Sequence, residues 1–180
     1  MTSGDAVSAA TETSTAVVAA AETSTAVVAA AIAKNLTVAT AESLTAGMVA
    51  ATLANTPGAS GMLQGGVVAY QNSVKAGVLG VPEGLLADVG SVDGAVAEAM
   101  ADGARRACGA RIGVSTTGVA GPDPHDGKAV GTVFVGIAAD AGTQAFEFSF
   151  TGDRQSIREQ ACEAALVRLL AALEGDGYRS

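Results

Sequence analysis

The chain has 180 residues, a hydrophobic content of 49% and a formal net charge of −8. This length predicts a single domain, and the excess of Ala and Gly over aromatic residues predicts close packing of helices on a sheet. The acidic balance argues against a nucleic-acid partner, because duplex binding depends on clustered Lys and Arg, and no apolar run approaches the roughly 20 residues that span a membrane.

The N-terminal segment contains a perfect duplication, since residues 12–21 and residues 22–31 both read ETSTAVVAAA. Two copies are too few for a solenoid. Ten helical residues rotate by about 1000°, roughly 80° short of whole turns, so the two copies cannot present their Val pairs on one stripe. We therefore expect one copy to pack on the domain and favour the second, which runs directly into the first strand. The reverse choice stays open, because extruding a longer loop costs little entropy.

The same reasoning predicts three parts of the chain. These are an N-terminal tail or extension over residues 1–21, one domain over residues 22–175, and a C-terminal tail over residues 176–180. The N-terminus lacks the basic segment of a signal peptide, so the cytoplasm is the expected location.

Beyond the duplication, strand-like and helix-like segments alternate. The expected strands cover residues 37–41, 62–70, 111–116, 131–139 and 144–150. The expected helices cover residues 45–54, 73–79, 92–108 and 153–173. A polar Pro/Gly loop follows the third strand, and a short turn joins the last two strands into a hairpin. The predicted fold class is α/β, a single three-layer α/β/α domain with a mixed sheet and an antiparallel hairpin.

Familiar nucleotide-binding and hydrolase signatures are absent from the sequence. No Gly stands at the Walker spacing before Lys128, no G-x-G-x-x-G follows a strand, and residues 113–117 lack the second Gly of a nucleophile elbow. The only histidine, His125, lies in the polar loop, where a solvated side chain is expected. Cys108 and Cys162 lie far apart and are expected to be buried free thiols. No metal and no cofactor are therefore implied.

Polar side chains instead gather where predicted strands end. Ser43 follows the first strand, Tyr70 closes the second, and Lys75 lies in the short helix that comes next. A Tyr or Lys acts as an acid or base when its surroundings lower its pKa, and Ser activated by Lys is a known alternative to Ser-His. Structural readings stay open beside this one, with Tyr70 and Lys75 at the surface and Ser43 and Thr45 as helix caps.

A second polar group follows the third predicted strand. The glycine loop at residues 118–121 either cradles an anion with its backbone N–H groups or forms a simple turn. Lys128 and Arg154 are the cations nearest to these loops, and either one serves as a phosphate partner or as a solvated charge. The helix N-terminus before Gly47 also offers N–H groups to an anion.

At these positions the sequence resembles the CinA carboxy-terminal domain family, whose stand-alone members are nicotinamide mononucleotide deamidases. The resemblance covers roughly residues 31–174. It rests on AESLTAG at 41–47, YQNSVK at 70–75 followed by LGV at 79–81, TGVAGP at 117–122, VGTV at 130–133 and GDR at 152–154. It implies hydrolysis of the nicotinamide carboxamide to nicotinic acid mononucleotide and ammonia, a role in pyridine-nucleotide salvage, and a homo-oligomer.

Carried over residue by residue, the resemblance implies Ser43 as the catalytic serine, with Tyr70 and Lys75 as its supporting polar pair. It also implies Thr117 and the glycine loop as the substrate wall and Arg154 as a phosphate partner. Together with the groups above, the candidate substrate-binding residues are Glu42, Thr45, Gly47, Thr117, Gly118, Gly121, Lys128 and Arg154. Glu42 either faces the cationic pyridinium or accepts structural hydrogen bonds. Whether Ser43 attacks the carboxamide itself or positions a water is left open.

Two features depart from the family pattern. Residues 44–47 read LTAG where the family often has CTGG, so Ala46 adds a methyl group at a position where close backbone approach matters. The loop at residues 123–127 is less rich in Gly than is usual. A non-catalytic nucleotide-binding or assembly module of the same fold is the alternative function, and a different amidohydrolase using the same Ser-Lys pair is another.

Overall fold

A computed structural model describes the backbone of residues 3–175 and the side chains of residues 18–175. Five strands form one sheet in the order β2–β1–β3–β4–β5. The strands are β1 (Val38–Glu42), β2 (Leu63–Val68), β3 (Ile112–Gly118), β4 (Thr132–Ala139) and β5 (Gly142–Ser149). β1 pairs in parallel with β2 and β3, whereas β4 pairs antiparallel with both β3 and β5. The predicted mixed sheet with an antiparallel hairpin is thus confirmed.

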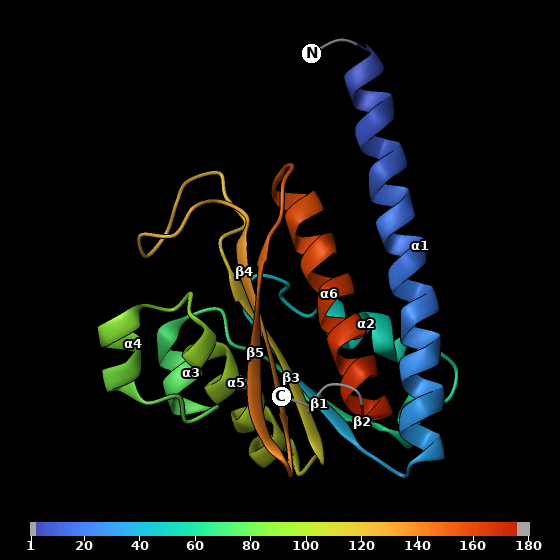
Figure 1. Ribbon diagram of the computed structural model, residues 1–180, viewed down its shortest axis with the longest axis vertical. Helices are drawn as coiled ribbons and strands as arrows, with labels where there is room; N and C mark the ends of the chain where they lie inside the picture. Colours follow the sequence, from blue (N-terminus) through green and yellow to red (C-terminus); the bar gives the residue numbers. More distant parts are fainter. Residues whose placement is uncertain (1–2, 176–180) are drawn as a thin grey trace.

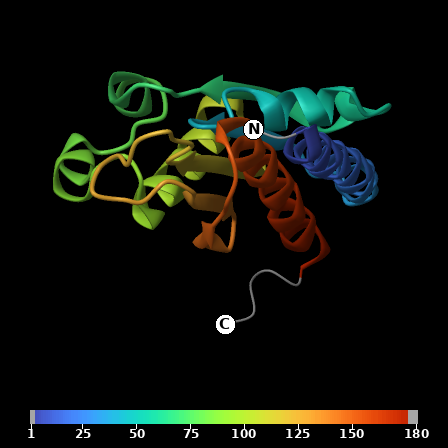
Figure 2. The ribbon, with the colours of Figure 1, turned by 90° about the horizontal axis from the view of Figure 1, so that it is seen from above.

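Helices cover both faces of this sheet, which confirms the three-layer prediction (Figures 1 and 2). One face carries α1 (Ser3–Ala33), α2 (Met48–Ala54) and α6 (Arg154–Glu174). The other face carries α3 (Asn72–Gly77), α4 (Glu83–Val89) and α5 (Gly94–Cys108). A short 3-10 helix, η1 (Ala59–Gly61), precedes β2. Within the described chain, no helix combines the length and the apolar character needed to cross a bilayer.

Small residues bring α5 very close to the sheet, as the composition predicts. A Cβ atom at Gly113 would lie 1.9 Å from the carbonyl oxygen of Ala101, and one at Gly136 would lie 2.3 Å from that of Ala97. Because strand side chains alternate between faces, the larger Val114 points to the opposite layer, where it joins the cluster under α1, α2 and α6. The glycines therefore let the backbone of α5 lie directly against β3 and β4.

The helix α1 runs unbroken through both copies of the duplication. The second copy supplies Ser24, Val27, Val28 and Ala31, all buried, to the face that contacts α2 and α6. In the first copy, the described Val18 side chain is 54% exposed. Figure 1 shows the N-terminal part of α1 projecting beyond the end of α6. The division of the chain at residue 21 stays a prediction.

Three local expectations are wrong. The helix expected from residue 45 begins at Met48, because residues 43–47 form a turn. The helix α4 was not expected; it is short, and Leu86 is its one buried residue. Both cysteines are free, but only Cys162 is buried, where burial raises the pKa of its thiol to about 12, whereas Cys108 is partly exposed.

Candidate functional site

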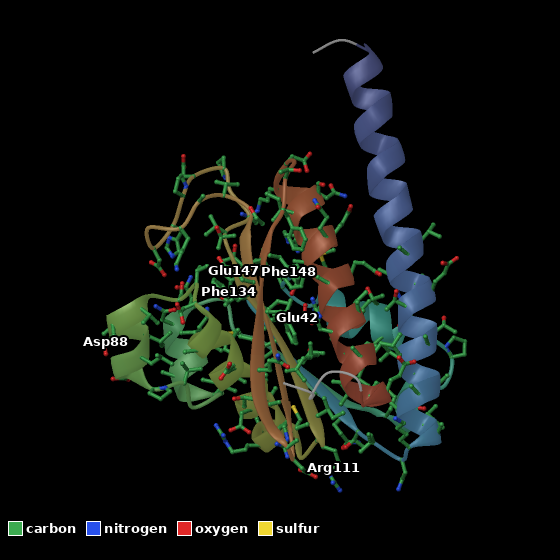
Figure 3. The ribbon with its side chains drawn as sticks, viewed as in Figure 1. Glu42, Asp88, Arg111, Phe134, Glu147 and Phe148 are labelled. Carbon is green, nitrogen blue, oxygen red and sulfur yellow. The ribbon has the colours of Figure 1, made fainter. Side chains whose placement is uncertain are left out.

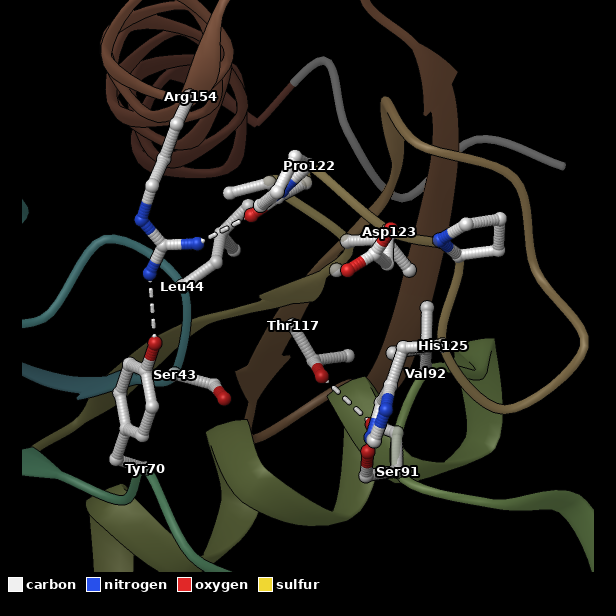
Figure 4. A pocket seen from close by; sticks show the side chains of 15 residues that line it. Ser43, Leu44, Tyr70, Ser91, Val92, Thr117, Pro122, Asp123, His125 and Arg154 are labelled. Atoms are coloured by element: carbon white, nitrogen blue, oxygen red, sulfur yellow. Dashed lines mark hydrogen bonds between the residues drawn. The ribbon is translucent and has the colours of Figure 1, made fainter.

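The candidate site lies at the carboxyl ends of the parallel strands β1, β2 and β3, the edge where open α/β sheets bind ligands. A pocket of about 330 Å³ opens there. Figure 4 shows the side chains of the 15 residues that line it. They are Ser43, Leu44, Tyr70, Ser91, Val92, the segment from Thr117 to His125, and Arg154. Five separate stretches of the chain therefore meet around one cavity.

Ser43 stands over a buried lysine. Lys75 is 1% exposed and lies behind Ser43 rather than on the pocket wall. Its Nζ contacts Ser43 Oγ at 3.2 Å, the carbonyl oxygen of Ala69 at 2.9 Å and that of Tyr70 at 3.4 Å. Burial lowers the pKa of the Lys75 amine, and the negative charge of Asp126 opposes part of this shift. An amine with a lowered pKa thus lies within hydrogen-bond distance of the Ser43 hydroxyl.

Arg154 joins three elements at the mouth of the pocket. Its Nη2 donates to Tyr70 Oη at 2.8 Å, and its Nη1 donates to the carbonyl oxygen of Gly121 at 2.7 Å (Figure 4). Arg154 is the first residue of α6, whose N-cap Asp153 accepts from the backbone N–H of Ser156. The structure therefore brings the predicted residues Ser43, Tyr70, Lys75 and Arg154 together.

The predicted glycine loop forms one wall of the pocket. Thr117 is buried, and its Oγ1 donates to the carbonyl oxygen of Ser91 at 2.6 Å. A Cβ at Gly118 would lie 2.7 Å from a carbonyl oxygen of β4. Gly121 has φ +83, and a Cβ there would lie 2.9 Å from Val130. Both glycines are thus required by close approach, and Gly121 also by its left-handed backbone.

Glu42 does not line the pocket. It is 1% exposed, and Figure 3 shows it in the interior of the molecule. Its Oε2 accepts hydrogen bonds from the backbone N–H groups of Gly47 at 2.9 Å and Val49 at 3.0 Å, and its Oε1 accepts from Ala50 at 2.8 Å. Of the two roles left open for Glu42, contact with the pyridinium and acceptance of structural hydrogen bonds, these contacts favour the second, because the carboxylate binds the N-terminus of α2.

Thr45 is likewise buried away from the pocket, and the expectation that it caps a helix is wrong. The N-cap of α2 is Gly47, which makes no side-chain cap bond. Thr45 Oγ1 instead lies 2.7 Å from Glu42 Oε2 and 2.7 Å from Thr116 Oγ1. Glu42 takes the capping role instead of Thr45. The two carboxylate oxygens of Glu42 reach the free N–H groups of the helix and carry the negative charge that a helix N-terminus favours.

Lys128 also lies outside the pocket lining. Its Nζ is 5.7 Å from the centroid of the Phe134 ring. The expectation for His125 is corrected in part: its side chain is 67% exposed, yet it lines the pocket. Sequence reasoning missed the lining residues Ser91 and Asp123. Ser91 follows the unexpected helix α4, so no predicted element pointed to it.

No group of three or more His, Cys, Asp or Glu side chains is arranged to hold a metal ion in the part of the chain that the structure describes. The pocket presents the Ser43 hydroxyl, the Tyr70 phenol and the Arg154 guanidinium, with the buried Lys75 amine behind Ser43. Such a set suits hydrolysis of a carbonyl compound by a nucleophile and a base.

The fold and the site together define an α/β protein with a Ser-Lys pair at the ends of the parallel strands. The family model described as the CinA C-terminal domain matches residues 8–173, and the chain belongs to this family. The match begins before residue 31, where the resemblance seen in the sequence starts, and so includes the duplicated segment.

The similar proteins carry related names. A CinA-like protein of Frankia casuarinae is 46% identical over 145 residues, which cover 79% of this chain and 34% of the relative. A CinA-like protein of Anaeromyxobacter sp. is 49% identical over 144 residues, which cover 78% of this chain and 35% of the relative. The chain thus spans about a third of the length of these curated relatives.

Solved structures share the whole fold. A CinA superfamily protein from Klebsiella pneumoniae superimposes with a TM-score of 0.83 at 31% identity, covering 87% of this chain and 98% of that one. The competence/damage inducible protein CihA from Agrobacterium tumefaciens gives a TM-score of 0.82 at 32% identity, covering 87% of this chain and 96% of that one.

Proposed function

We propose that the protein hydrolyses the carboxamide of nicotinamide mononucleotide to nicotinic acid mononucleotide and ammonia, as an amidohydrolase of pyridine-nucleotide salvage. The observation that carries the proposal is the contact of 3.2 Å between the buried Lys75 amine and the Ser43 hydroxyl. The family resemblance supplies the substrate, and it also implies a homo-oligomer, which stays a prediction.

The surroundings of Lys75 support its role as a base. A carbonyl oxygen only accepts hydrogen bonds, so the two N–H groups of a neutral amine point to the carbonyl oxygens of Ala69 and Tyr70. The lone pair of the amine is then left for the Ser43 hydroxyl. Because burial lowers the pKa of Lys75, the neutral form is favoured relative to an exposed lysine. Ser43 therefore faces an acceptor for its proton.

Two routes follow from this arrangement. In one, Ser43 Oγ attacks the carboxamide carbon while Lys75 takes its proton, ammonia leaves, and water then hydrolyses the ester. In the other, Ser43 positions the attacking water. In both, a proton from Lys75 or Tyr70 goes to the leaving nitrogen, and the backbone N–H groups of the glycine wall are the candidates to stabilise the developing oxyanion.

Arg154 is the proposed phosphate partner. Two of its N–H groups already bind Tyr70 and Gly121, and a guanidinium has five, so three remain for a ligand. Arginine binds phosphate oxygens by charge-assisted, often bidentate hydrogen bonds. Lys128, the other candidate, lies outside the lining, which makes Lys128→Ala a natural control.

The test is ammonia release from nicotinamide mononucleotide by the purified protein, with the acid product measured in parallel. Ser43→Ala and Lys75→Ala should each lower the rate by a factor of at least ~100, while Lys128→Ala stays near wild type. A near-wild-type rate for Ser43→Ala would refute the catalytic assignment. Binding of the mononucleotide without ammonia release would instead indicate the non-catalytic module.

Phosphate recognition has its own test. Arg154→Ala should raise KM for the mononucleotide, and nicotinamide riboside, which lacks the phosphate, should be a poor substrate for every variant. Equal kcat/KM values for mononucleotide and riboside would rule out the phosphate role.

A further inference from the structure

A single stretch of loop forms much of one pocket wall. Residues 121–125 are consecutive and all line the pocket, and they belong to the polar loop at residues 121–130. The position of this wall therefore depends on what holds the loop against the rest of the domain.

The next residue, Asp126, binds the loop to another segment. Its Oδ2 accepts hydrogen bonds from the backbone N–H of Ser91 at 2.5 Å and from Ser91 Oγ at 2.7 Å. Ser91 also lies on the pocket wall, and its carbonyl oxygen accepts the Thr117 hydroxyl at 2.6 Å (Figure 4). A continuous path of hydrogen bonds thus runs from the loop, through Ser91, to β3.

The backbone on both sides is shaped for this contact. Gly90 has φ +79, and a Cβ there would lie 2.8–2.9 Å from the carboxylate and Cβ atoms of Asp126. Asp126 has φ 50, a left-handed value that is uncommon outside glycine. Such conformations persist where the surrounding contacts hold them. The close approach of Asp126 to Ser91 therefore needs a glycine at position 90.

We propose that Asp126, Ser91 and Gly90 form a latch that fixes the loop wall and so sets the affinity for the substrate, while Asp126 itself does not touch the substrate. Asp126 is then a positioning residue. Its carboxylate is an acceptor of charge-assisted bonds, which are stronger than neutral ones. The activity test of this proposal rests on the proposed function, but its structural test does not.

Breaking the latch should change KM more than kcat. Ser43 follows β1 and Lys75 lies in α3, and neither makes a hydrogen bond to Asp126, Ser91 or Gly90, so both groups keep their places when the latch is broken. The loop wall moves and binding weakens. We expect Gly90→Ala to raise KM for nicotinamide mononucleotide about tenfold, with kcat changed less than about twofold. Asp126→Ala should raise KM by a similar factor, but it also removes the negative charge that raises the pKa of Lys75, so the pH dependence of its rate should shift to lower pH.

The chain offers a matched control for the glycine variant. Gly109 also has a left-handed backbone, with φ +64, but nothing lies within 4 Å of a Cβ built there. Gly109 follows the last residue of α5, whereas Ser91 lies near the first residue of α5, at the opposite end of this helix. Gly109→Ala therefore carries the backbone strain without the collision, and should leave KM unchanged. Ser91→Thr, which keeps the hydroxyl, should stay closer to wild type than Ser91→Ala.

Hydrogen exchange without substrate gives the structural readout. Amides of residues 121–130 should exchange faster in Asp126→Ala and Gly90→Ala than in wild type, while those of α5 should not. Unchanged exchange in both variants would overturn the latch. Faster exchange with an unchanged KM would overturn its role in affinity. Should the wild type release no ammonia, the proposed function fails, and mononucleotide binding measured by calorimetry replaces KM in the same comparison.

Discussion

The most informative single substitution for the local structure of the site is Glu42→Gln. Both carboxylate oxygens of Glu42 accept backbone N–H groups, two at Oε2 and one at Oε1. A glutamine amide has one acceptor oxygen, so either orientation turns its NH₂ toward a backbone donor. The better orientation keeps the bonds from Gly47 and Val49 and leaves the N–H of Ala50 without its partner.

The size of the effect follows from this count. An orphaned buried donor costs about 1–3 kcal/mol, and losing a negative charge at a helix N-terminus costs roughly 0.3–2 kcal/mol. We expect Glu42→Gln to lose roughly 2–4 kcal/mol of unfolding free energy, a fall in Tm of about 4–16 °C at this chain length.

Thermal and urea unfolding followed by circular dichroism provide the assay. Glu147→Gln on β5, whose side chain is exposed (Figure 3), is the matched control and should change stability by less than about 0.5 kcal/mol. An equally small change in Glu42→Gln would refute the reasoning. A raised KM at unchanged stability would favour the other role for Glu42, contact with the pyridinium.

Three further predictions concern the base, a strained residue and the duplication. The kcat/KM should rise with pH, and the midpoint of this rise should lie below the ordinary lysine pKa of about 10.4. The reason is that only the neutral Lys75 amine accepts a proton and that burial lowers the pKa of Lys75. A midpoint at or above the ordinary value would contradict this prediction. Ala46 has φ 50, so Ala46→Gly should stabilise the protein by roughly 0.5–1 kcal/mol through relief of left-handed strain, and a lower Tm would disprove it. Deleting residues 12–21 places Ala10 where the buried Ala20 stands, so Tm and activity should stay nearly unchanged, and hydrogen exchange of the full-length chain should show which copy is protected.

The fold was predictable because its signals are local. The alternation of apolar strands with helical segments fixes a layered sheet, and the turn before Gly142 fixes the final hairpin. The failures have local causes as well. The sequence places the start of α2 three residues too early. Capping rules look for the capping side chain in the turn before the helix, whereas here the carboxylate of Glu42, at the end of β1, binds the helix N-terminus. The helix α4 is seven residues long, too short for a periodic signal.

The candidate site was predictable only in part. Ser43, Lys75 and Arg154 were found through motifs at strand and helix ends, where ligands are expected. Ser91 and Asp126 were not found, because their contact joins two loops that are 35 residues apart in the sequence. No periodicity or motif encodes such a contact; it depends on the sheet order that brings the segments together.

The Ser-Lys pair places the demands of chemistry and of stability in opposition. Because burial lowers the pKa of Lys75, the unfolded chain binds more protons at this residue than the folded chain does. Unfolding free energy therefore falls as pH drops from about 10.4 toward the lowered pKa of the folded state. The proposed base is thus neutral in a pH range where burying it weakens the fold. The neighbouring apolar cluster, with Leu79, Val81 and Met100 buried, offsets that cost, since burying such side chains contributes about 1.5–3 kcal/mol each. The close packing of α5 on the sheet is therefore part of what allows an amine to lie buried behind Ser43.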